Sequence, residues 1–441
     1  MSEQLPEPIV CCAGCAQQVI TPPAGVSMAG YFHDRVAKSV RDDLYAKAMV
    51  IEHDGRRIAL VSCDLISIDA EATEGARKLI QADVGIPPEH VMVCATHTHT
   101  GPELREDAVV PPATEWAVEL PKHIAHAVRM AVDGMKPSTL RVGSAHAEGY
   151  AHNRLFRLKD GTEVFGARGR ENEVIAPAGP TDPQLQTLSV VDVDGKLMGM
   201  AVNFALHVDV IGGGSAKFIS ADWPGEMARA VAALHGSDVV TLLFQGTCGD
   251  INHVPHDPTN LPRSGPAKAV QIGRGLAGVA LHASERAEPM TALALDSRIV
   301  TLSIPYYTRD EALFAELKAL RAKPKRSPFE DYTLKRGEAW PHDGKIADVP
   351  VQVIRIGDVG VVALPAEIFV GIGLDIKKWS PAPSTFVVEL ANARVSTYVA
   401  TTDQAERGAY GAKPILSRWL CADAGRRMAD AAVTTLHQMW G

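Results

Sequence analysis

The chain has no apolar stretch long enough to cross a bilayer, and no run of basic residues. A membrane-spanning helix needs about 20 consecutive apolar residues, so we expect no stable membrane association. The formal net charge of -8 argues against nucleic acid as a partner. The first eight residues carry two acids and two prolines where a secretory signal needs a basic start and an apolar core. These absences predict a cytoplasmic protein that acts on a small molecule.

Cysteine is also scarce. The chain has seven cysteines, an odd number, which fits reduced thiols better than a disulfide framework. Cys12 and Cys15 form a single CxxC pair beside Cys11, and without a second pair we expect these residues to be structural. At 441 residues, one large domain or two closely packed domains are compatible with the length. A homo-oligomer is also compatible with this composition.

Strand-like and helix-like patterns alternate along the chain, which predicts sheets covered by helices, an α/β or mixed α+β fold. Strands are expected at 46–52, 57–63, 90–95, 140–142, 188–193, 197–204, 239–244, 292–304, 351–356, 359–364 and 386–390. Helices are expected at 70–82, 114–132 with a break near Pro121, 267–288, 309–322 and 422–439. Asp222 and Pro224 suggest a further helix start. Residues 159–184 are expected to form an ordered surface loop.

Residues suited to metal binding or proton transfer recur just after the apolar runs. They are Asp64, His97 with His99, His207, Asp250 with His253, Glu367 and Tyr398. In an extended segment the spacing of His97 and His99 puts both imidazoles on one face. A His-x-His pair also arises by chance in a chain with 16 histidines, and a single histidine is more often a core or surface residue. Their recurrence at strand ends, where α/β proteins bind ligands, favours a site.

Imidazoles, a carboxylate and a further oxygen donor make a suitable site for one Zn²⁺ ion with a position left for water. A metal in such a site lowers the pKa of water and polarises a carbonyl oxygen, which is what hydrolysis of an amide or ester requires. The residues alone do not exclude a second metal ion, because Asp250 and His253 could complete a second metal position. A structural role for Asp250 in its own glycine loop is an equally good interpretation.

Four short motifs resemble the catalytic domain of the neutral/alkaline, non-lysosomal ceramidase family. They are ATHTHTGP at 95–102, NFALH at 203–207, LPAE at 364–367 and YVAT at 398–401. Supporting motifs are ITPP at 20–23, GY at 30–31, SCDL at 62–65, NR at 153–154, DPQL at 182–185 and SAD at 220–222. The resemblance implies stacked mixed β-sheets flanked by helices in a single catalytic domain over 1–441, with an excursion or subdomain joint at 323–350.

The resemblance also implies the roles of individual residues. One Zn²⁺ per chain would be held by His97, His207, Glu367 and Tyr398. His99 would lie beside the metal as an acid/base, and Arg154 would contact the polar end or the carbonyl group of the substrate.

The chain departs from the family pattern at three points. Asn252, in Gly249–His253, stands where the ceramidases have a serine implicated in catalysis, so metal-activated water becomes the expected attacking group. Asn252 could instead help Tyr398 and Arg154 to stabilise the oxyanion. The C-terminal immunoglobulin-like domain and the secretory signal of ceramidases are missing as well.

These observations predict a zinc-dependent hydrolase that cleaves the amide bond of a soluble N-acyl substrate. Two other enzyme classes stay open: a metal-dependent esterase or lactonase, and a metal-dependent isomerase or lyase acting on a hydroxy acid or sugar. A scaffold that has lost catalysis is a further alternative.

Overall fold

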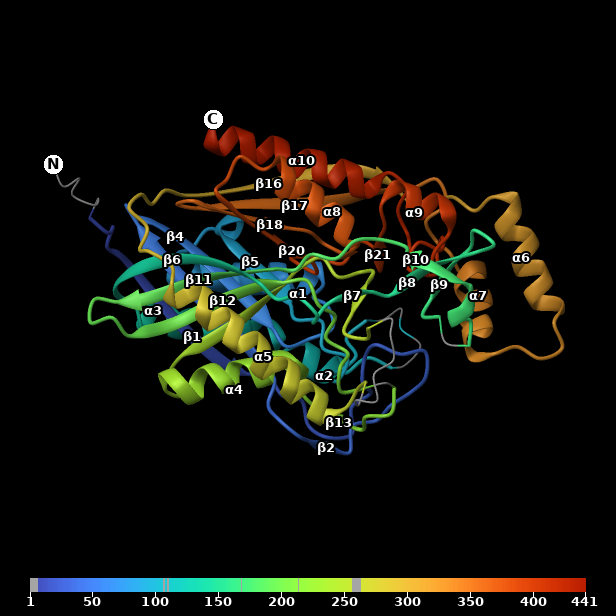
Figure 1. Ribbon diagram of the computed structural model, residues 1–441, viewed down its shortest axis with the longest axis horizontal. Helices are drawn as coiled ribbons and strands as arrows, with labels where there is room; N and C mark the ends of the chain where they lie inside the picture. Colours follow the sequence, from blue (N-terminus) through green and yellow to red (C-terminus); the bar gives the residue numbers. More distant parts are fainter. Residues whose placement is uncertain (1–6, 106–107, 109–110, 168, 213, 256–262) are drawn as a thin grey trace.

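The protein is built in four layers, in which two β-sheets are stacked face to face and helices cover both outer faces (Figure 1). The computed structural model describes residues 7–441 apart from 106–107, 109–110, 168, 213 and 256–262. This arrangement confirms the predicted class of stacked mixed sheets flanked by helices. Within the described residues, no helix is both long and apolar enough to span a bilayer.

The larger sheet has eight strands in the order β14-β12-β11-β6-β1-β3-β4-β5. Their bounds are β1 (Cys11–Val19), β3 (Tyr45–His53), β4 (Arg56–Cys63), β5 (Val91–Ala95), β6 (Lys136–His146), β11 (Gln184–Asp192), β12 (Leu197–Phe204) and β14 (Val240–Gln245). Only β4–β5 and β12–β14 pair in parallel. The sheet curves so that its two ends approach each other, and Ser62 on β4 donates a hydrogen bond to the Leu243 carbonyl on β14 at 2.6 Å. The loops after β5 and β12 are thereby brought together.

The smaller sheet has the order β16-β17-β18-β20, with β16 (Leu295–Pro305), β17 (Ile346–Ile356), β18 (Val359–Ala363) and β20 (Ser384–Val388). Its inner face packs on the inner face of the larger sheet. Neighbouring residues of β3 point to opposite faces, so that Met49 lies in the core between the sheets and Ala48 in the core beneath the helices. Burial on both faces explains why many strands appear in the sequence as continuous apolar runs.

Helices cover the outer faces of both sheets. The larger sheet is covered by α1 (Ala70–Val84), α3 (Leu120–Asp133), α4 (Asp222–His235) and α5 (Pro266–Glu285), and the smaller sheet by α8 (Val370–Trp379) and α10 (Ala424–Trp440). Asp69 caps α1 by accepting a hydrogen bond from the Ala72 amide, and Gly85 ends the helix in the left-handed conformation. The expected break near Pro121 is confirmed, because α2 (Thr114–Ala117) ends before α3 begins.

Short elements connect the layers. They are β2 (Ser39–Val40), β7 (His152–Asn153), β13 (Phe218–Ile219), β15 (Ile251–Asn252), β19 (Glu367–Ile368), β21 (Tyr398–Val399), α9 (Thr402–Arg407) and the 3-10 turns η1 (Pro88–His90) and η2 (Glu171–Glu173). The loop expected at 159–184 contains more regular structure than its glycine, proline and charge content suggested. Here β8 (Leu155–Leu158), β9 (Glu163–Phe165) and β10 (Val174–Pro177) form a small sheet.

Asp222 does not cap its helix as the sequence suggested. The N-cap position belongs to Ala221, and Asp222 is the first residue of α4, with a positive φ of 57°. Its carboxylate instead accepts hydrogen bonds from the amides of Val210 and Ile211 at 3.0 and 2.9 Å. Asp222 therefore holds the loop that follows His207, and it also accepts a hydrogen bond from the adjacent Trp223 amide at 2.6 Å.

The segment around 323–350 extends two helices beyond the layers. These are α6 (Glu311–Ala322) and α7 (Pro328–Glu338), which lie at one end of the molecule in Figure 1. Ser327 and Glu330 form a capping box at the start of α7. Phe32 packs against Phe329 and Tyr332 of α7, with ring centroids 5.4 and 5.3 Å apart. The division of the chain into one domain with an excursion here stays a prediction.

Candidate metal centre

His97 and His99 lie on the loop that leaves the carboxyl end of β5. The His97 amide donates to the Leu65 carbonyl at 2.8 Å, and the His99 amide donates to the Val208 carbonyl at 3.1 Å. The segment is not the extended strand assumed from the sequence, because His97 has a φ of 72°. A non-glycine residue in this region is strained unless its surroundings fix it, and such residues cluster at functional sites. The two hydrogen bonds fix the loop on both sides.

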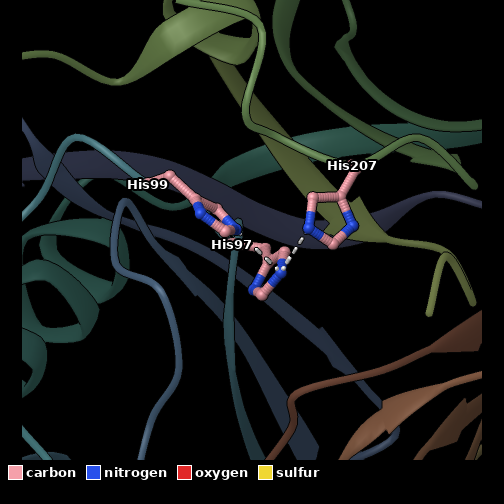
Figure 2. A group of neighbouring side chains, drawn as sticks. All are labelled: His97, His99 and His207. Carbon is pink, nitrogen blue, oxygen red and sulfur yellow. Dashed lines mark hydrogen bonds between the residues drawn. The ribbon is translucent and has the colours of Figure 1, made fainter. Parts of the chain in front are cut away.

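Three imidazoles converge at this point, with His207 arriving from the end of β12 (Figure 2). The Nε2 atom of His97 lies 3.1 Å from Nε2 of His207 and 3.3 Å from Nε2 of His99. All three residues are buried. The Nδ1 atom of His97 faces the Ile66 carbonyl at 2.8 Å, and Nδ1 of His207 faces the Cys248 carbonyl at 3.4 Å. A carbonyl oxygen only accepts, so each Nδ1 carries the proton and each Nε2 presents a lone pair.

Glu367 and Tyr398 lie in a separate two-stranded sheet made of β19 and β21. They face each other in the parallel pairing of β19 with β21. Glu367 Oε2 lies 3.5 Å from His97 Nε2, and Glu367 Oε1 lies 3.8 Å from His207 Nδ1. The backbone pairing therefore places the Tyr398 phenol next to a carboxylate that lies beside two histidines.

Arg154 closes the cluster on another side. Its guanidinium donates to the Gly249 carbonyl at 2.6 Å and to the Tyr398 hydroxyl at 3.1 Å, and it pairs with Glu367 Oε1 at 3.3 Å. Nη1 lies 3.4 Å from Nε2 of His207. Three of the residues predicted to bind the metal, His207, Glu367 and Tyr398, thus meet around one buried cation.

Burial controls the protonation of this cluster. It lowers the pKa of His99 and of His207 well below the ordinary value, and the neighbouring histidines and Arg154 act in the same direction. Both imidazoles are therefore neutral at neutral pH. Burial and the charge of Glu367 raise the pKa of Tyr398 well above its ordinary value. Burial alone would lower the pKa of Arg154, but Tyr398 and Glu367 outweigh it and raise that pKa.

The comparison with known proteins agrees with this arrangement. The sequence profile of the neutral/alkaline non-lysosomal ceramidase N-terminal region matches residues 12–250, more than half of the chain. The chain belongs to this ceramidase family. The match includes His97, His99, Arg154 and His207, and it ends before Glu367 and Tyr398.

Individual ceramidases show the same relationship. Neutral ceramidase of Pseudomonas aeruginosa is 29% identical over 197 residues, which are 42% of this chain and 28% of that protein. The crystal structure of neutral ceramidase from Pseudomonas aeruginosa superposes with a TM-score of 0.77 at 22% identity, over 99% of this chain and 75% of that one. A ceramidase complexed with C2 gives a TM-score of 0.74 at 21% identity, over 98% and 74%. The matched segment thus spans less than a third of the curated relative's length, whereas the shared fold covers 99% of this chain and 75% of the crystallised ceramidase.

The loop after β14 carries Asn252, which was predicted to stand at the position of a serine in the ceramidases. Asn252 lies in β15, where its side-chain oxygen accepts a hydrogen bond from the Val254 amide at 3.0 Å. Its role at the oxyanion stays a prediction. Asp250 accepts from the Val370 amide and from the Asn153 side chain, both at 2.8 Å. These contacts give Asp250 the structural role that the sequence left open, because they join the loop to the start of α8 and to β7.

His253 lies on the same loop, and its Nε2 lies 2.6 Å from the Arg263 carbonyl. Burial lowers its pKa to about 4. Among the described residues, only His97, His99 and His207 form a group of three or more histidine, cysteine or acidic side chains close enough together to hold one metal ion. His253 is not part of that group.

Two buried residues that the sequence analysis did not name support His207 in this ceramidase-family centre. Cys248 Sγ lies 3.5 Å from His207 Nδ1 and donates to Glu389 Oε1 at 3.0 Å. Glu389 Oε2 also accepts from the amides of Cys248 and Ile368, at 3.1 and 2.6 Å. Burial, and then the charge of Glu367, raise the pKa of Glu389 well above its ordinary value. Glu389 directly follows the apolar strand β20, and this position is the sequence feature that could have identified it.

Other aromatic and acidic residues near the site were also missed. Tyr410 packs against Tyr398 with ring centroids 5.9 Å apart, and the Arg154 guanidinium lies 5.7 Å from the centroid of Tyr410. Asp209 follows His207 by two residues, the same spacing that singled out His97 and His99. Tyr31 lies in the GY motif. The i, i+2 spacing from His207 could have identified Asp209. Tyr31 and Tyr410 could not be identified in this way, because they reach the site only through tertiary contacts.

The chemistry of the donors fits a divalent cation. The Nε2 lone pairs of His97 and His207 face each other at 3.1 Å without a proton to share, so a cation between them would relieve their repulsion. Neutral imidazoles with a nearby carboxylate are ligands that zinc accepts readily. Their Nδ1 atoms face carbonyl oxygens, an outer contact that commonly orients histidine ligands. The group His97, His99 and His207 can therefore hold a metal ion.

Proposed function

We propose that the protein is a zinc-dependent hydrolase that cleaves the amide bond of a water-soluble N-acyl substrate in the cytoplasm. The observation that carries the proposal is the convergence of three buried imidazole Nε2 atoms beside Glu367 in a member of the ceramidase family. The name of the Pseudomonas aeruginosa relative, neutral ceramidase, supports an amide as the scissile bond.

In this proposal His97, His207, Glu367 and Tyr398 hold the metal. When bound, a zinc ion would polarise the substrate carbonyl and lower the pKa of water. Arg154 would bind the oxygen on which negative charge develops, because its guanidinium already lies within 3.4 Å of His207 Nε2. His99, whose Nε2 also faces His97, would deliver a proton to the leaving nitrogen.

Two further parts of the proposal concern the substrate and the compartment. Asp209 and Tyr31 lie beside His99, and these polar groups support a substrate with polar atoms near the scissile bond. All seven cysteines are free, which is typical of a reducing compartment. A homo-oligomer stays a prediction.

The test is a metal analysis of the purified protein followed by an activity screen. We expect about one zinc per chain, and hydrolysis of some members of a series of N-acyl 4-nitroanilides, from acetyl to dodecanoyl, that a chelator abolishes and added zinc restores. His97→Ala and His207→Ala should lose both metal and activity. Failure to bind zinc even after its addition would contradict the metal site.

The same screen separates the alternatives. Reaction in isotopically labelled water must place solvent oxygen in the product of hydrolysis, whereas an isomerase places none there. Esters and lactones of matched acyl groups, run in parallel, decide between an amidase and an esterase. Turnover of ceramide as fast as that of the short substrates would show that the preference for a soluble substrate is wrong.

A further inference from the structure

Asp209 and Tyr31 form a hydrogen-bonded pair beside His99 that the proposed mechanism does not use. The Tyr31 hydroxyl lies 2.7 Å from Oδ1 and 2.6 Å from Oδ2 of Asp209, so the phenol donates to the carboxylate. The Asp209 side chain keeps 25% of its surface exposed. The two residues come from distant parts of the chain, and their contact is made only in the folded protein.

The two nitrogens of His99 face different surroundings. Nε2 faces His97 Nε2 at 3.3 Å and therefore points into the candidate metal centre. Nδ1 points away from it, is buried, and has no hydrogen-bond partner. Asp209 Oδ2 lies 4.0 Å from Nδ1, so a carboxylate stands about one ångström beyond hydrogen-bond range of an unsatisfied ring nitrogen. Catalytic hydrogen bonds are often long before substrate binds.

The surrounding residues restrict how the His99 ring can lie. Arg35 donates to the His99 carbonyl at 2.7 Å, and its guanidinium lies 4.3 Å from the centroid of the Tyr31 ring. The edge of Tyr31 packs against His99 with ring centroids 5.7 Å apart. Gly30 has a φ of 100°, and a Cβ there would lie 2.3 Å from His99 Nδ1. The backbone thus approaches the ring on the side of Nδ1 so closely that only glycine fits.

The tautomer of His99 determines which of its two ring nitrogens can accept a proton. A neutral imidazole carries its single proton on either Nδ1 or Nε2. A proton on Nε2 would point into the centre and block proton acceptance there. A carboxylate beside Nδ1 favours the opposite tautomer, because an ionised acceptor makes the stronger hydrogen bond.

We propose that Asp209, oriented by Tyr31, is a positioning residue that keeps the proton of His99 on Nδ1 and leaves Nε2 free to exchange a proton at the centre. Its catalytic consequence rests on the proposed hydrolysis. In that reaction the carbonyl C–N bond breaks and a C–O bond forms to water. His99 Nε2 accepts a proton from the attacking water and passes it to the leaving nitrogen, while the Nδ1 proton stays between His99 and Asp209.

The tautomer can be observed without substrate. The protein carrying nitrogen-labelled histidine is studied by NMR at neutral pH. The His99 signals are assigned by their loss in His99→Gln. We expect the Nδ1-protonated tautomer in the parent protein, with and without zinc, and a gain of the Nε2-protonated form in Asp209→Asn. The Nε2-protonated form in the parent, or an unchanged tautomer in Asp209→Asn, would overturn the proposal.

Kinetics with an N-acyl 4-nitroanilide then test the consequence. For Asp209→Asn we expect kcat to fall about 10–100-fold, the usual loss when an outer hydrogen-bond partner is removed, with KM changed less than about twofold. Tyr31→Phe should also lower kcat, but by a smaller factor. This variant keeps the test usable if Asp209→Asn does not fold. Asp192→Asn is the matched control, because Asp192 is buried in a distant turn where its Oδ1 accepts backbone hydrogen bonds that asparagine can also accept.

Each kinetic outcome decides the question. A loss confined to KM, a change in kcat of less than about twofold, or an equal loss in Asp192→Asn would show that Asp209 does not position His99. If the parent protein hydrolyses no anilide, the proposed function is wrong, whatever the role of Asp209. The NMR measurement then still decides whether Asp209 sets the tautomer.

Discussion

Glu367 lies directly opposite Tyr398 in the parallel pairing of β19 and β21. The two side chains are held side by side by backbone hydrogen bonds, since the Glu367 amide donates to the Thr397 carbonyl at 3.0 Å. Both residues are buried. Two oxygen donors far apart in the chain are therefore kept at a fixed separation before any metal binds, which reduces the cost of ordering them.

Glu367→Gln and Tyr398→Phe should each weaken zinc binding more than about tenfold, because even the loss of an outer contact commonly costs that much. The measurement is a competition titration with a chromophoric chelator. Tyr307→Phe is the control, since Tyr307 makes its hydrogen bond to Asp310 outside the centre. Unchanged affinity in both variants would remove these residues from the ligand set and leave the three histidines.

The part of the site that the sequence could predict is the part carried by long strands. His97 and His207 follow β5 and β12, whose apolar runs are long enough to recognise, and strand ends are where ligands bind. Glu367 and Tyr398 lie in strands of two residues each, which have no periodicity to detect. Both were candidates because they follow apolar runs, but their assignment as metal ligands came from the resemblance to ceramidases.

The long elements were predicted almost to their ends for the same reason. Helix α1 was expected at 70–82 and spans Ala70–Val84, and β4 was expected at 57–63 and spans Arg56–Cys63. The small sheet of β8, β9 and β10 was missed because its strands have only three or four residues, too few for an alternating pattern to be recognised. Asp222 looked like a cap because helix starts favour aspartate, but hydrogen bonds to a distant loop decided its conformation.

Glu389 is expected to stabilise the fold beneath the centre. Replacing it with alanine leaves the buried amides of Cys248 and Ile368 without their acceptor, and each unsatisfied group costs about 1–3 kcal/mol. Glu389→Ala should therefore lower the free energy of unfolding by about 2–6 kcal/mol, measured by urea denaturation of the metal-free protein. Glu389→Gln keeps an acceptor oxygen and should lose much less. Equal losses in the two variants would show that cavity formation, and not the hydrogen bonds, accounts for the effect.

Phe32 should hold the α6–α7 segment against the body of the protein. Its contacts with Phe329 and Tyr332 are of a kind worth about 0.5–1.5 kcal/mol beyond burial, enough to shift a local opening equilibrium. In Phe32→Ala we expect faster tryptic cleavage after Lys325 or Arg326, located by mass spectrometry, with little change in Tm. The control is Phe314→Ala, an exposed phenylalanine of α6 that packs on Arg309. Equal cleavage rates in parent and Phe32→Ala would contradict this docking role.

His253 makes the stability of the protein depend on pH. Its folded pKa of about 4 lies below the ordinary 6.5, so the folded state keeps the imidazole neutral while the unfolded chain takes up a proton. Stability is therefore lost as the pH falls from about 6.5 towards about 4, by up to about 3 kcal/mol from this one group. Asp222 and Asp209, whose pKa values are raised to about 7 and about 6, act in the opposite direction over much of this window.

The contribution of His253 is isolated by comparing the pH dependence of Tm in the parent and in His253→Gln. A glutamine amide can still donate to the Arg263 carbonyl but does not titrate, so the variant should lose less Tm on acidification than the parent. The exposed His282 of α5 is the control, and His282→Gln should follow the parent curve. If the parent and His253→Gln lose Tm in parallel between about pH 6.5 and 4, the buried imidazole does not set the acid limit of this fold.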